Sequence, residues 1–85
     1  MFSKACEYGI RASIYIAQQS LLDRKVNLKE ISEAIESPTA YTSKILQKLS
    51  RNSLINTDKG PTGGFSIDRV KLEKVKLSSI VFAID

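Results

Sequence analysis

The stretch SPTAYTSKILQKLSRNSLINTDKGPTGGF, residues 37–65, constrains the fold more than any other part of the chain. It opens on Ser37-Pro38, which predicts the start of a helix because serine is favoured as an N-cap and proline at the first helical position. Two short extended runs, 54–58 and 65–68, come after that helix and flank the segment KGPTGG. Glycine and proline so placed favour a hairpin loop. A helix followed directly by a β-hairpin is therefore predicted.

Apolar periodicity predicts two more helices before this stretch. Residues 3–19 form the first, with Ser3 as N-cap and apolar side chains almost all the way round, which is typical of a central helix. Residues 28–35 form a short second helix after Asn27, a suitable N-cap. The inward stripes predicted for the second and third helices are Leu28, Ile31 and Ile35, and Thr42, Ile45, Leu46 and Leu49.

The order of these elements indicates one class of fold. About two residues separate the second and third helices, the compact connection of a helix-turn-helix. A last helix is predicted over 77–84, where apolar residues again recur at helical spacing and run to the end of the sequence. That ending suggests that more protein follows or that a partner covers the stripe. We expect a mainly α fold with a small β-hairpin, a winged helix-turn-helix domain spanning residues 1–85.

The residue types present narrow the possible functions. The sequence has no histidine, the commonest general base and metal ligand, and one cysteine, Cys6. We therefore expect no enzyme and no zinc or iron–sulfur cofactor held by these residues. Cys6 itself is expected to be a small core residue. The sequence has no long apolar run and no signal-peptide pattern, so a cytoplasmic protein without a membrane partner is predicted.

The predicted third helix, about residues 38–52, carries a strip of positive charge. Lys44, Lys48 and Arg51 recur three and four residues apart, and no acid lies between Glu36 and Asp58. Such side chains can pair with phosphate or with guanine, and the net charge of +4 favours a polyanionic partner. A basic helix face is more often an ordinary solvated surface. Its place between a helix-turn-helix and a hairpin nevertheless favours contact with double-stranded DNA.

Two further cations are candidates for DNA contact. Lys59 lies at the tip of the predicted wing, residues 58–65, and narrow minor grooves attract such cations. The alternative for this segment is a plain hairpin turn. Arg11 lies three residues after Tyr8 in the first helix, and we favour phosphate contact for Arg11 and packing for Tyr8.

Three motifs together resemble one family. EYGIRA near the start, AYTSKILQKL in the third helix and KGPTGGF in the hairpin are similar to the Rrf2 family of bacterial transcription regulators. The resemblance covers essentially all 85 residues. It implies that the third helix enters the major groove of DNA and that the wing lies at the adjacent minor groove.

The resemblance also implies roles for single residues and shows departures from the family. Ala40, Tyr41, Ser43 and Lys44 would face bases or phosphates, and Lys59 would be the basic residue of the wing tip. Family members usually continue into a long dimerisation helix, and many bind an iron–sulfur cluster through three cysteines after the wing domain. Both features are missing from this sequence. Glu36 stands where the family often has glycine, and Thr42 replaces a usual leucine.

We therefore predict a sequence-specific, DNA-binding transcriptional regulator that forms a homodimer and has no iron–sulfur cluster in this chain. The alternative is a winged-helix module that binds a protein partner instead of DNA. The predicted DNA-binding residues are Arg11, Ala40, Tyr41, Ser43, Lys44, Lys48, Arg51 and Lys59.

Overall fold

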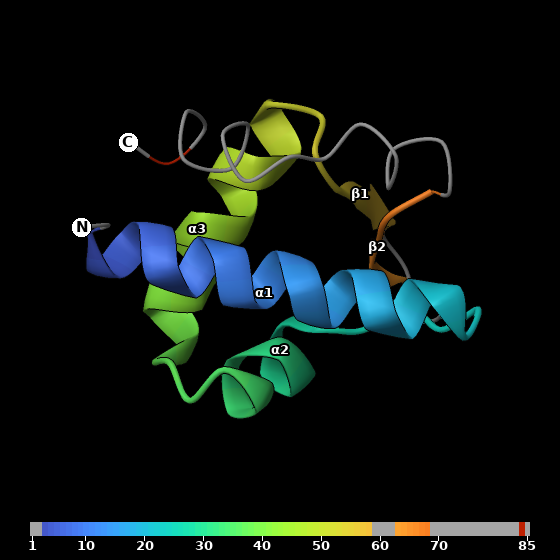
Figure 1. The fold of residues 1–85 in the computed structure, drawn as a ribbon, viewed down its shortest axis with the longest axis horizontal. Helices are drawn as coiled ribbons and strands as arrows, with labels where there is room; N and C mark the ends of the chain where they lie inside the picture. The colour runs from blue at the N-terminus through green and yellow to red at the C-terminus, as the bar shows by residue number, and fades with distance from the viewer. Residues whose placement is uncertain (1–2, 59–62, 69–83, 85) are drawn as a thin grey trace.

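The computed structural model describes residues 3–58, 63–68 and 84. It contains helices α1 (Lys4–Leu21), α2 (Leu28–Ala34) and α3 (Thr39–Arg51), and strands β1 (Asn56–Asp58) and β2 (Gly64–Ser66). Figure 1 shows α1 crossing α3, with α2 on one side of α1 and the hairpin near the C-terminal half of α1. The predicted mainly α fold with a small β-hairpin is confirmed.

All three helices bury side chains in one core. Ile16 of α1, Ile31 of α2 and Leu49 of α3 have no exposed surface. Cys6 is also fully buried, as expected for a small core residue. The inward stripe predicted for the third helix is confirmed, and its one polar member, Thr42, donates its hydroxyl to the Pro38 carbonyl at 2.9 Å. That bond satisfies a polar group that would otherwise be costly to bury.

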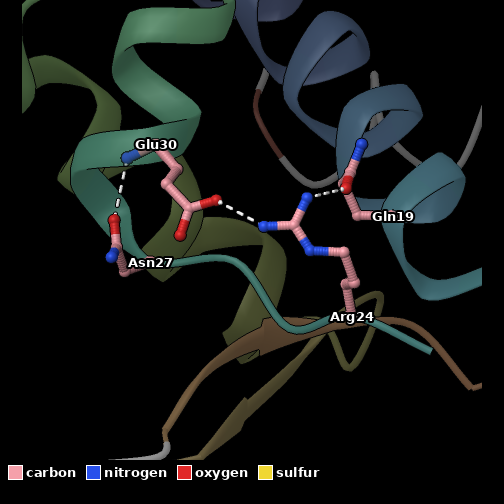
Figure 2. Close-up of polar contacts among 4 residues, drawn as sticks. All are labelled: Gln19, Arg24, Asn27 and Glu30. Atoms are coloured by element: carbon pink, nitrogen blue, oxygen red, sulfur yellow. Dashed lines mark hydrogen bonds and ion pairs between the residues drawn. The ribbon is translucent and has the colours of Figure 1, made fainter. Parts of the chain in front are cut away.

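Two predicted helix caps form as expected. The Ser3 hydroxyl accepts the Cys6 amide at 3.1 Å, and the Asn27 side chain accepts the Glu30 amide at 2.8 Å. The carboxylate of Glu30 points toward the side chain of Arg24 (Figure 2). It lies 3.4 Å from the guanidinium of Arg24, which also donates to Gln19 at 2.8 Å. Arg24 thereby joins the end of α1 to the start of α2.

The predicted start of the third helix was wrong by one residue. Pro38, not Ser37, is the N-cap of α3, and no side chain caps this helix. Ser37 is buried, and its amide donates to the Ser32 carbonyl at 3.0 Å. Its hydroxyl has no partner. The turn out of α2 directs Ser37 into the interior, so its hydroxyl is not available to the first amides of α3. The connection between the helices spans residues 35–38 and is longer than predicted.

Glu36 adopts a left-handed backbone in this connection, with φ of 55°. Replacing Glu36 with glycine is expected to stabilise the protein by about 0.5–1 kcal/mol, since a side-chain-bearing residue pays roughly 1–2 kcal/mol for this conformation and glycine loses part of that gain as entropy. Chemical denaturation should detect the change. Glu36→Ala removes the same charge but keeps the strain, so it should give no gain. Equal stabilisation by both variants would assign the effect to charge.

A third segment completes the hairpin. Strands β1 and β2 are antiparallel, with Thr57 opposite Phe65. Phe65 also pairs with Val26, which lies in the connection between α1 and α2. Two hydrogen bonds, of 2.7 and 3.1 Å, join the backbones of these two residues. Lys25, next to Val26, makes an ion pair with Asp58 at 2.5 Å. The sequence pattern did not predict this pairing, because a single apolar residue between Lys25 and Asn27 gives no strand periodicity.

The predicted last helix, residues 77–84, lies outside the described residues except for Ile84. Ile84 is buried and belongs to the core. The predicted strands were longer than those observed, since 54–55 and 67–68 lie outside the paired residues. Ile55 and Ile67 are nonetheless buried, so both ends of the hairpin are fixed to the core.

Candidate nucleic-acid interface

The outward face of α3 carries exposed positive charge. Ala40, Lys44 and Arg51 are exposed there. Within the described ranges 3–58, 63–68 and 84, neither Lys44 nor Arg51 has an ion pair or a hydrogen bond from its side chain. Two such cations about two helical turns apart, with no acid on the helix, can bind successive anionic groups.

Lys48 differs from the other two cations of the predicted strip. It is exposed, but its ammonium group donates to the carbonyl oxygen of Ile84 at 3.3 Å. The amide of Asn52 donates to the Lys48 carbonyl at 2.8 Å. The side chain of Lys48 thus connects α3 with the end of the described chain, while its spacing alone suggested a position equivalent to that of Lys44.

Tyr41 is held at the start of α3 by an aromatic contact. Its ring lies 5.6 Å from that of Tyr8, centroid to centroid, at an interplanar angle of 81°. The ammonium of Lys4 lies 5.8 Å from the Tyr8 centroid. This edge-to-face geometry is a favourable one for aromatic pairs. The contact fixes the N-terminal turn of α3 against α1, which accords with the packing role favoured for Tyr8.

Ser43 lies on the flank of α3 that faces the hairpin. It is half-buried and lines a hollow of about 340 Å³ between α3 and the two strands. The other polar residues of this hollow are Gln47, Ser50, Arg51 and Thr57. Gln47, Ser50 and Thr57 were not among the predicted site residues. The helical spacing of Ser43, Gln47 and Ser50 was a usable signal, but their neutral side chains drew less attention than the cations.

The remaining two predicted residues lie elsewhere. Arg11 is exposed on α1 and lines an open hollow with Lys4, Glu7 and Ile10. Lys59 lies outside the described residues. Asp58 beside it is the acid nearest to the predicted wing tip, and its ion pair with Lys25 offsets its charge.

The residues present do not fit an iron–sulfur cluster. Clusters are held chiefly by cysteine thiolates, and the sequence offers only Cys6, which is fully buried in α1. Across the described part of the chain, no three histidine, cysteine, aspartate or glutamate side chains group as metal ligands would. None of the helices in that part is long and apolar enough to cross a membrane.

Known proteins share both this sequence pattern and this fold. A family model described as Rrf2, iron-dependent transcriptional regulator, matches residues 2–85. A protein of Aquifex aeolicus named as an HTH-type transcriptional regulator is 30% identical over 81 residues, which cover 95% of this chain and 54% of that protein. The chain spans about half the length of the curated relatives it matches.

Solved structures of two regulators superpose on the whole chain. IscR from T. potens matches with a TM-score of 0.87 at 24% identity and is covered to 61% of its length. CymR, the global cysteine regulator of B. subtilis, matches with a TM-score of 0.87 at 17% identity and is covered to 64%. These likenesses confirm the winged-helix fold. With the family match over residues 2–85, they lead to one conclusion: the chain belongs to the Rrf2 family of transcriptional regulators.

Proposed function

We propose that this chain binds double-stranded DNA in a sequence-specific manner, with α3 in the major groove and the hairpin at the adjacent minor groove. The observation that carries the proposal is the pair of exposed cations Lys44 and Arg51, which lie on a helix without acids and have no ion pair to a described residue. Phosphate contacts from lysine and arginine supply most of the affinity, and contacts to base edges supply specificity.

The residues of α3 divide into two roles in this proposal. Ala40, Ser43 and Lys44 face the bases from the N-terminal half of the helix, which is where recognition helices read DNA. Tyr41 contributes its hydroxyl while its ring stays against Tyr8. Contacts to phosphates come from Lys48 and Arg51 on α3, from Arg11 on α1, and from Lys59 on the wing.

The regulator acts in the cytoplasm. It binds DNA as a homodimer, because two-fold symmetric operators match dimers of helix-turn-helix proteins. Its relatives extend beyond the length matched here, which leaves room for a dimerisation element in the whole protein. The proposal includes no catalytic step and no iron–sulfur cluster in this chain.

Selection of bound sequences from random duplex DNA, at two salt concentrations, tests the function. We expect enrichment of one motif that persists at the higher salt, since base contacts are less sensitive to salt than phosphate contacts. Failure to enrich any motif would contradict sequence-specific binding. It would favour the alternative, a module for protein binding, for which Ile14, Leu21 and Leu22 on α1 offer exposed apolar surface.

The variant Lys59→Ala tests whether the wing tip contacts a phosphate. Removing one phosphate contact should reduce the slope of log K against log salt concentration by about 0.9. Titrations of the selected duplex at several salt concentrations measure this slope. Thr62→Ala, three residues further along the sequence, leaves the charge unchanged and serves as the control. An unchanged slope for Lys59→Ala would remove the wing tip from the set of phosphate contacts.

A further inference from the structure

The hollow between α3 and the hairpin has a polar rim and an apolar floor. Leu46, which is buried, and Phe65, which is half-buried, form the floor. The rim consists of Ser43, Gln47, Ser50, Arg51 and Thr57. No carboxylate lines the hollow among the described residues. It therefore presents hydrogen-bond donors and one positive charge over a hydrophobic base.

Two hydroxyls of this rim are already paired with each other. The oxygens of Ser50 and Thr57 lie 2.8 Å apart, and either one can be the donor. Two hydroxyls carry two hydrogens, and the bond between them uses only one. The second hydrogen has no acceptor within the described part of the chain. The pair thus fixes β1 against α3 and still offers one donor to a third group.

The other donors of the rim are free as well. In residues 3–58, 63–68 and 84, no intramolecular hydrogen bond or ion pair uses the side chain of Gln47 or Arg51. Arginine presents five N–H donors in a planar fork that matches the oxygens of a phosphate. The ligand that suits these groups is an anion with several acceptor oxygens and a size that fits a volume of about 340 Å³.

The geometry of a DNA duplex supplies such an anion at this place. One sugar–phosphate strand separates a major groove from the neighbouring minor groove. A protein that places α3 in one groove and the hairpin in the other must therefore straddle that strand, and the hollow lies between these two elements. We propose that the hollow is a binding site for a single backbone phosphate of this strand, an inference that rests on the proposed function.

Each residue then has a defined task. The guanidinium of Arg51 and the amide of Gln47 bind the phosphate oxygens from α3. The Ser50–Thr57 pair donates its free hydrogen and sets the angle between α3 and the hairpin. Arg51 is a phosphate contact and not a reader of bases, so its loss weakens binding to all sequences alike.

The experiment uses duplexes in which one phosphate at a time is replaced by a neutral methylphosphonate. The wild-type protein should lose affinity at a phosphate between the two grooves. Arg51→Ala should bind unmodified DNA about 10- to 100-fold more weakly, and Ser50→Ala about two- to tenfold more weakly. Arg51→Ala should lose most of the sensitivity to the modification at that one phosphate and Ser50→Ala part of it, because two changes to a single contact are not additive.

Two controls make the result decisive. Gln18→Ala, at an exposed polar residue of α1 outside the hollow, should keep wild-type affinity and sensitivity. Thr57→Val removes the other hydroxyl and should reproduce the effect of Ser50→Ala. Variants that bind DNA but keep the wild-type sensitivity at every phosphate would overturn the hollow as a phosphate site, while DNA binding itself would stand. A wild-type protein that binds no duplex would overturn both proposals.

Discussion

Replacing Lys44 with alanine is expected to raise the Kd for the selected duplex roughly 5- to 150-fold, the equivalent of about 1–3 kcal/mol for loss of a base contact. Lys44 is exposed on α3, and its side chain has no ion pair or hydrogen bond to any of the described residues. The midpoint of thermal unfolding should therefore stay within the experimental error. Fluorescence titration with labelled duplex and a thermal melt of the same sample measure both quantities.

A control for net charge accompanies this variant. Gln18→Glu also lowers the net charge by one unit, at an exposed position on α1. If long-range attraction alone held the DNA, Gln18→Glu and Lys44→Ala would weaken binding equally. A local contact predicts a much larger effect for Lys44→Ala, with altered preference at one base position. Normal DNA binding by Lys44→Ala would refute the assignment of α3 as the recognition helix.

Replacing Gly64 with alanine is expected to destabilise the protein by about 2–4 kcal/mol, the sum of backbone strain and weakened hydrogen bonds. Gly64 has φ of 157°. A Cβ atom there would lie 2.8 Å from the carbonyl oxygen of Val26 and 3.2 Å from its carbonyl carbon. These are backbone atoms, so relief requires that Val26 and the strand move apart.

The cost falls on the contact that holds the wing. Moving Val26 would break its paired hydrogen bonds with Phe65, and the hairpin would lose its attachment to the connection between α1 and α2. We expect a lower unfolding midpoint in urea, together with weaker DNA binding. Ser66→Ala, in the same strand, is the control and should change stability little. A Gly64→Ala protein as stable as wild type would show that the close approach of Gly64 to the Val26 backbone does not limit the side chain at this position.

Local signals were sufficient for most of the secondary structure. Ser3 and Asn27 cap α1 and α2 as predicted, because an N-cap depends only on amides within the next helical turn. The local sequence context predicted the wrong N-cap for α3, at Ser37. Its sequence context suits an N-cap, but burial of Ser37 in the turn after α2 outweighs that preference.

In the candidate site, too, features set by local spacing were predicted and contacts between distant residues were not. Spacing predicted that Lys44 and Arg51 share the outward face of α3, since helical periodicity determines it. The bond from Lys48 to Ile84 joins residues far apart in the sequence, and no local pattern could indicate it. The paired hydroxyls of Ser50 and Thr57 likewise depend on how the hairpin folds back against α3.

The sequence by itself determined three helices, a glycine-rich hairpin, a basic face without acids and the lack of a cysteine or histidine ligand set. These features depend on residue type and on periodicity within one element. Only the tertiary structure decided that Val26 would pair with Phe65, that Ser50 would bond to Thr57 and that a hollow would form beside α3. Each of these depends on contacts between elements, whose energies are set by packing and not by the residues nearest in sequence.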